Sequence, residues 1–89
     1  MNEKQYEVGE VRMFEFQVTS KNKEAVIITS ATWELKKRDT VVTRGDCDIN
    51  KDYISMLVPM QTAGDFLLEI KAEIPPETII ERMHIRVVE

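Results

Sequence analysis

Apolar and polar side chains alternate along most of this chain, in short runs between Val11 and Val88. Successive side chains of an extended strand point to opposite faces, so each run predicts a strand with one buried face. The longest run has one face composed of Phe66, Leu68, Ile70, Ala72 and Ile74. Pro75 and Pro76 end this run, because proline has no amide hydrogen to donate to a neighbouring strand.

The other runs predict strands of the same kind. Their expected inward residues are Phe14, Phe16 and Val18; Ala25, Ile27, Ala31, Trp33 and Leu35; Cys47 and Ile49; Ile54, Met56 and Val58; and Ile79, Met83, Ile85 and Val87. Turn signals separate the runs, among them the polar turn from Ser20 to Lys23 and the hairpin candidate from Arg38 to Thr40.

Three places leave alternatives open. Val11 and Met13 are out of phase with Phe14, which predicts either a bulge near Met13 or a strand that starts there. The segment that begins at Ala25 fits one long bent strand or two short ones, since it starts with apolar residues on both faces. Gly45 with Asp46 marks a bulge or a turn.

These runs predict an all-β domain of about seven strands, because no window of helical length keeps an apolar stripe. Two antiparallel sheets packed face to face would bury Phe14, Phe16, Trp33 and Phe66 between them. A length of 89 residues fits one domain. We expect residues 1–10 to form a loose polar segment and residues 11–89 a single sandwich domain.

Charge and composition narrow the classes of partner. Twelve basic and sixteen acidic residues give a net charge of −4, which offers no basic surface for nucleic acid. The single cysteine, Cys47, excludes an internal disulfide. The first residues contain no apolar signal region, and no stretch approaches the length needed to cross a bilayer. We therefore expect a protein made in the cytoplasm without an export signal, with no membrane or nucleic-acid partner.

An acidic alternation resembles the opening of a calcium-binding loop. The four residues are Asp46, Asp48, Asn50 and Asp52. The rest of that motif is missing, since Lys51 occupies the glycine position and Leu57 the position of the closing glutamate. An ordinary half-buried strand explains the same alternation, and we expect no metal site.

Other candidate chemistry also has a simpler explanation. Arg44-Gly45-Asp46 is a tripeptide found in some adhesion ligands, but three residues occur often by chance, and we expect a bulge glycine between solvated charges. His84 is expected to face solvent and Cys47 the core, so they form no nucleophilic pair. We expect no enzymatic activity, no catalytic residues and no cofactor.

Several apolar side chains remain after each strand is given an inward face. They are Val26, Ile28, Leu57, Leu67, Ile80 and Val88. If several of them share the outer face of one sheet, they would form a patch that marks a protein contact surface. They are the only candidate site that the sequence offers.

The order of the strand motifs resembles a known family. The motifs are Phe14-Glu15-Phe16-Gln17-Val18-Thr19, then Ala31 to Lys36, Tyr53 to Pro59, Ala63 to Ile70, and Met83 to Val88. Together they resemble the small immunoglobulin-like sandwich domains of phage and prophage tail, baseplate and head-accessory proteins. The resemblance covers residues 11–88, and it departs from the family where Asp65-Phe66 stands in place of a commoner tyrosine.

The resemblance implies a non-enzymatic structural or accessory component of a phage or phage-like particle. Such a protein would act through contacts with other particle components or with itself, made by a sheet face or by an unpaired edge strand, and it would be assembled into a virion. The alternative is a cytosolic bacterial binding or regulatory module that recruits a partner by edge-strand addition.

Overall fold

The computed structural model describes residues 3–20 and 26–89, which contain eight strands and no helix. The strands are β1 (Glu3–Glu7), β2 (Val11–Gln17), β3 (Ser30–Lys37), β4 (Thr40–Asp46), β5 (Asp48–Asn50), β6 (Tyr53–Pro59), β7 (Gly64–Ile74) and β8 (Glu77–Val88). No helix in this part of the chain is therefore long and apolar enough to span a membrane. The expected all-β class is confirmed, with one strand more than the alternation indicated.

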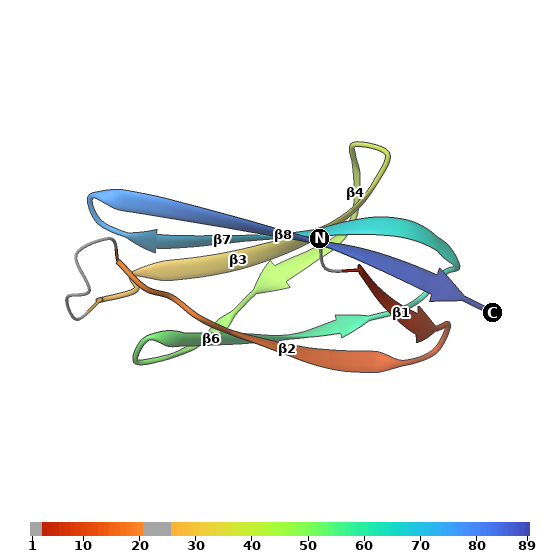
Figure 1. The fold of residues 1–89 in the computed structure, drawn as a ribbon, viewed down its shortest axis with the longest axis horizontal. Coiled ribbons are helices and arrows are strands. Elements are labelled where there is room, and N and C mark those ends of the chain that lie inside the picture. Colours follow the sequence, from red (N-terminus) through yellow and green to blue (C-terminus); the bar gives the residue numbers. More distant parts are fainter. Residues whose placement is uncertain (1–2, 21–25) are drawn as a thin grey trace.

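The strands form two sheets that pack face to face. The five-stranded sheet has the order β1-β8-β7-β3-β4, and the three-stranded sheet has the order β2-β6-β5. In Figure 1 the second sheet lies below the first, with β2 and β6 running along its length. Neighbouring strands are antiparallel except β1 and β8, which are parallel. The expectation of two antiparallel sheets is thus confirmed apart from this one pair.

Strand β1 corrects the expectation of a loose segment over residues 1–10. Residues 3–7 pair in register with residues 84–88 of β8. This strand cannot be recognised from its sequence, because Glu-Lys-Gln-Tyr-Glu has no apolar alternation and the pairing depends on backbone hydrogen bonds. Tyr6 packs against the core, edge to face with Phe14 at a centroid distance of 5.9 Å.

Strand β2 matches neither alternative at Met13, because it has no bulge and begins at Val11 rather than at Met13. It pairs with β6 without interruption from Val11, opposite Pro59, to Gln17, opposite Tyr53. No bulge occurs near Met13. Val11 and Met13 are out of phase with the buried Phe14 simply because they point outward from the sheet.

The inward face expected for the segment that begins at Ala25 is wrong at its start. Strand β3 begins only at Ser30. Before it, Ile28 is 8% exposed and lies in the core, whereas Ile27 is 80% exposed. Thr29, the last residue before β3, donates one backbone hydrogen bond to Glu73. The ladder of β3 does not extend further back, so the alternation of β3 does not apply to Ile27 and Ile28. Ala25 and residues 21–23 of the expected polar turn lie outside the described residues.

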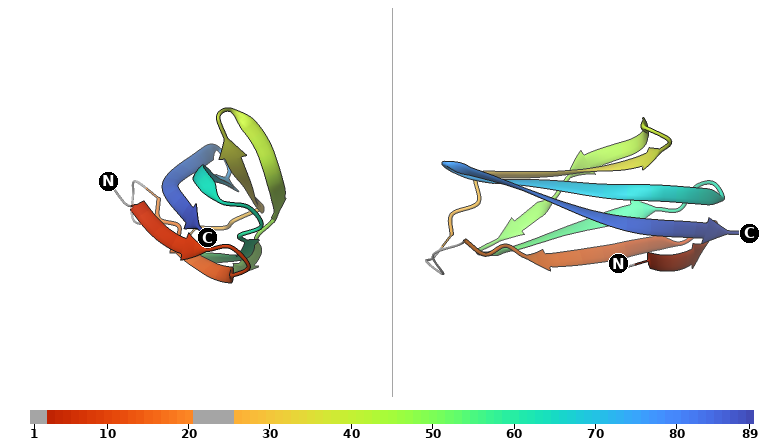
Figure 2. Two further views of the ribbon diagram at one scale, coloured as in Figure 1. Left: turned by 90° about the vertical axis from the view of Figure 1, so that its right-hand side faces the viewer. Right: turned by 45° about the horizontal axis from the view of Figure 1, so that its top comes forward.

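The β3–β4 hairpin turns where the sequence predicts. Arg38 and Asp39 have φ values of 50° and 67°, as a two-residue turn with two left-handed positions requires. The hairpin stands out from the body of the sandwich in Figure 2. Gly45 is neither a bulge nor a turn but an ordinary strand position opposite Trp33, and the irregularity lies near the hairpin, between Leu35 and Lys36.

The core lies between the sheets and contains the expected inward residues of β3, β6 and β7. Its most deeply buried members are Ile54, Val58, Met60, Leu68 and Ile85. Phe14, Trp33 and Phe66 are buried as expected, and Phe16 is half-buried against them. Ile49 was expected inside but is exposed, because β5 has only three residues at the edge of its sheet.

Candidate functional site

The outer face of the three-stranded sheet carries large apolar side chains in contact with water. Val11, Met13 and Leu57 are 59%, 66% and 60% exposed. Met13 lies directly opposite Leu57 in the β2–β6 ladder, and Val11 lies opposite Pro59. We call the surface formed by Val11, Met13, Leu57 and Pro59 the β2–β6 patch. Opposed side chains on one face of an antiparallel pair lie close together, so the patch is continuous.

Polar groups surround the β2–β6 patch. The same face continues into Glu15 and Gln17 on β2, and Gln17 Nε2 donates a hydrogen bond to Asp52 Oδ2 at 2.9 Å. Arg12 belongs to the other face, where its guanidinium lies 5.1 Å from the centre of the Tyr6 ring and 3.6 Å from Glu10. An apolar area bordered by polar groups is typical of a protein contact surface.

The six apolar residues singled out in the sequence do not share one face. Leu57 lies in the β2–β6 patch, whereas Leu67 and Ile80 lie on the outer face of the five-stranded sheet. Val88 is half-buried near the end of β8. The expectation for Ile28 is wrong because its side chain is in the core, and Val26 packs against that core.

Sequence reasoning missed Val11 and Met13, which form half of the β2–β6 patch. The signal was present, because both residues are out of phase with Phe14. It was interpreted as a possible bulge. Only the unbroken pairing with β6 shows that the phase change places two apolar side chains in water.

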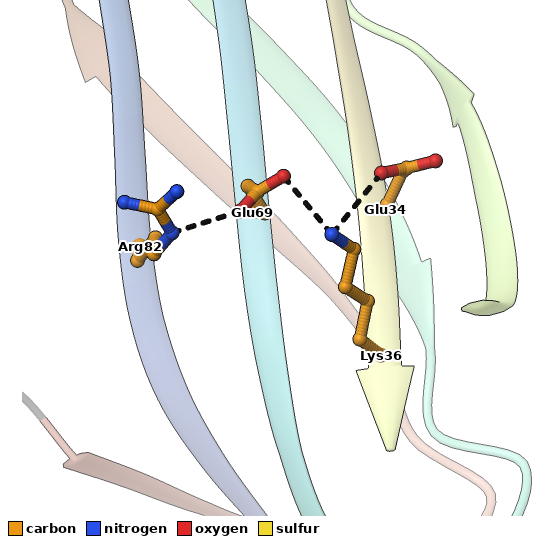
Figure 3. A network of polar contacts seen from close by, with 4 residues as sticks. All are labelled: Glu34, Lys36, Glu69 and Arg82. Atoms are coloured by element: carbon orange, nitrogen blue, oxygen red, sulfur yellow. Dashed lines mark hydrogen bonds and ion pairs between the residues drawn. The ribbon is translucent and has the colours of Figure 1, made fainter. Parts of the chain in front are cut away.

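The outer face of the five-stranded sheet is charged rather than apolar. Glu34 on β3, Glu69 on β7 and Arg82 on β8 occupy one row across the sheet. Arg82 Nε lies 2.8 Å from Glu69 Oε2, and Lys36 Nζ lies 3.2 Å from Glu69 Oε1 and 3.6 Å from Glu34 Oε1 (Figure 3). Two glutamates directly opposite each other would repel, and Lys36 offsets that repulsion by binding both.

This network shifts the pKa values of two of its members. Hydrogen bonds from Lys36 and then Arg82 lower the pKa of the Glu69 carboxyl, against a smaller opposing effect of burial. The hydrogen bond to Glu69 is the largest cause that raises the pKa of the Lys36 ammonium group. Both shifts favour the charged pair at neutral pH, so the network joins three strands with an ion pair on each side of Glu69.

We expect Glu69→Gln to lower the free energy of unfolding by about 0.2–1 kcal/mol at pH 7, the range of exposed ion pairs. Because the folded-state pKa of Glu69 is lowered, its contribution exists at neutral pH and disappears as the pH falls below the ordinary glutamate value of 4.5. Urea titrations of wild type and variant should therefore converge in acid. Glu15→Gln, which removes an exposed carboxylate that has no ion pair among the described residues, should change stability little at any pH. A gap that persists unchanged in acid would contradict this assignment.

The other candidate groups do not form a reactive site. Burial, with smaller effects of Asp46 and Asp48, raises the pKa of the Cys47 thiol to about 11, so the thiol is neutral and a poor nucleophile at pH 7. Asp46 ends β4 and Asp48 begins β5, where the chain passes from one sheet to the other. Within residues 3–20 and 26–89, no three acidic, histidine or cysteine side chains are grouped so that they could hold a metal ion. His84 is exposed on the outer face of β8.

Comparison with known proteins shows the fold but no family. No protein-family model matches the chain, and no curated protein matches its sequence. Solved structures do match. Titin domain M7 superposes with a TM-score of 0.69 over 100% of this chain and 88% of that chain, at 11% identity. CopC from Methylosinus trichosporium OB3b superposes with a TM-score of 0.66 over 96% of this chain and 83% of that chain, at 8% identity.

An engineered protein gives a TM-score of 0.77 at 11% identity, with 98% of this chain covered. This chain spans only 18% of that protein's length. Together with the 5+3 strand arrangement, these likenesses establish an immunoglobulin-like β-sandwich similar to the titin M domains and to CopC. At such low identity the likeness concerns the fold alone, and it carries no residue role over to this chain.

Proposed function

We propose that this chain is a non-enzymatic structural or accessory component of a phage or phage-like particle, and that the β2–β6 patch is its contact surface for another particle protein. The order of strand motifs over residues 11–88 supports the particle assignment. The single observation that supports the mechanism is the outward exposure of Val11, Met13 and Leu57 on adjacent paired strands.

The β2–β6 patch has the properties that such a contact requires. Full burial of one Val, Leu or Met side chain contributes roughly 1.5–3 kcal/mol, so three of them could provide most of the affinity of a specific interface. Both strands are held by an unbroken ladder and by the core beneath, so the patch would lose little conformational freedom on binding. The adjoining Glu15 and Tyr53 would provide a polar rim.

The second candidate function is a cytosolic bacterial module that recruits a partner by edge-strand addition. Strands β4 and β1 end the five-stranded sheet, and β2 and β5 end the other. An extended segment of a partner could pair with any of these edges. This function would depend on backbone groups and would tolerate changes in the β2–β6 patch.

The test is co-expression with the proteins encoded by neighbouring genes, followed by isolation of particles or complexes. We expect the double variant Met13→Lys with Leu57→Lys to lose incorporation, because two charges would then be buried in the contact. The control is Ile80→Lys, which changes an exposed apolar residue on the other sheet and should leave incorporation intact. Normal incorporation of the double variant would rule out the β2–β6 patch, and absence of the wild-type chain from particles would contradict the particle assignment.

A further inference from the structure

The charges on the outer face of the five-stranded sheet are matched on its inner strands but not at its β4 edge. Among the described residues, every Lys and Arg that points outward from β3, β7 and β8 has an acidic partner within 4 Å. These residues are Lys36, Lys71, Arg82 and Arg86. Arg44 and Asp46 on β4 point to the same face and are exposed, yet within the described part of the chain neither has an ion pair or a side-chain hydrogen bond.

Strand β4 also has an unpaired backbone edge. It is the last strand of its sheet, and β3 is its one neighbour. From Thr43 to Asp46 its pairing with β3 is regular, so its other side presents a regular row of backbone groups. The register shift lies outside this stretch, nearer to the hairpin. At the other end of β4, Cys47 donates its N–H to Ala31 O of β3 at 2.9 Å. In Figure 2 the hairpin end of β4 projects from the sandwich, and the other end leads into β5 of the three-stranded sheet.

We propose that β4 pairs with β4 of a second copy of this chain, antiparallel and about a two-fold axis at Gly45. In a symmetric antiparallel pair, residues at equal distances on either side of the axis lie opposite each other. Arg44 of one copy then lies opposite Asp46 of the second copy, and the symmetry repeats this pair. Both unmatched charges are thereby paired on the outer face, as they already are on β3, β7 and β8.

Gly45 fits the same arrangement. It lies opposite its own copy at the axis, and because it has no side chain, the two strands meet there without a side-chain contact.

Charged residues on an edge strand also serve to prevent pairing. That role calls for like charges that repel when two edges meet. Arg44 and Asp46 do the reverse, because their alternation is self-complementary in the antiparallel register about Gly45. The two roles therefore predict opposite responses to a charge change, and this difference makes the proposal testable.

The experiment measures the mass of the full chain by light scattering after size exclusion over a wide range of concentrations. We expect the wild type to form a dimer that weakens as salt is raised. Arg44→Asp and Asp46→Arg should each weaken association by more than about tenfold, because each places like charges opposite each other twice. The double variant, which exchanges the two charges, should restore association. Arg44→Gln should give an intermediate loss without adding an acid beside Glu34.

Circular dichroism and thermal unfolding of each variant verify that the monomer is folded. A wild type that stays monomeric at every concentration, a single variant that dimerises like wild type, or a double variant as weak as the singles would each overturn the proposal. Met13→Lys with Leu57→Lys should leave this dimer unchanged, because the β2–β6 patch lies on the other sheet. Failure of the β4 dimer is thus distinguishable from failure of the proposed function.

Discussion

Replacing Leu68 by alanine should lower the free energy of unfolding by about 2–5 kcal/mol, the range for a leucine deleted from a close-packed core. Leu68 is fully buried, at 0% exposure, in β7, which lies at the centre of the five-stranded sheet between β8 and β3. Its neighbours in the ladder are fixed on both sides, so the surroundings can collapse only partly into the space that the side chain leaves. Urea or thermal unfolding at pH 7 measures the loss.

The adjacent Leu67 provides a matched control with the same side chain on the same strand. Leu67 points to the outer face and is half-buried, so Leu67→Ala should cost less than about 1.5 kcal/mol. For a domain of this size, each kcal/mol corresponds to a shift in melting temperature of about 4–8 °C. Equal losses for the two variants would contradict the assignment of inner and outer faces on β7, and with it the two-sheet core.

Gly45→Ala should lower the free energy of unfolding by about 1–3 kcal/mol, although it adds a single methyl group to an edge strand. A Cβ at Gly45 would lie 3.0 Å from Trp33 Nε1 and 3.1 Å from two ring carbons of the same indole. The indole is rigid and buried in the core, so it cannot move aside cheaply. Unfolding should be measured at low protein concentration, where association through β4 does not contribute.

A double-mutant cycle with Trp33→Phe isolates this clash. Phenylalanine lacks the ring nitrogen and the second ring, so the added methyl group would meet little of the side chain. Gly45→Ala should then cost clearly less in the Trp33→Phe background than in the wild type. If the cost is the same in both backgrounds, contact with Trp33 is not the reason for a glycine at this position.

The sequence predicted the parts of the fold in which burial alone determines the pattern. The inward sets of β6 and β7 were identified residue by residue, because a strand with one face in the core must alternate. Strand β1 could not be found in this way, since backbone pairing with β8 holds it and places no requirement on its side chains. Ile28 was placed on the wrong face because the alternation of β3 does not continue into the residues before Ser30, which lie outside the strand.

The candidate site was predicted only in part for a related reason. Leu57 was identified as an apolar side chain left over on a well-defined strand, and it does lie in the β2–β6 patch. The side chains next to Leu57 depend on which residues of β2 pair with β6. This register is set by contacts between segments that are far apart in the sequence. The same holds for Glu69, whose partners Lys36 and Arg82 lie 33 and 13 residues away along the chain.

The parallel pairing of β1 with β8 also determines how the domain would respond to tension. Residue 3 begins β1 and residue 88 ends its partner stretch of β8, and the two strands run in the same direction. A force that pulls these two points apart would act along the strands and load all of the hydrogen bonds between them together. An antiparallel pair pulled from the same end would instead open one bond at a time. The strand that the sequence did not reveal would thus act as a mechanical clamp, useful wherever this domain is a link in a structure under load.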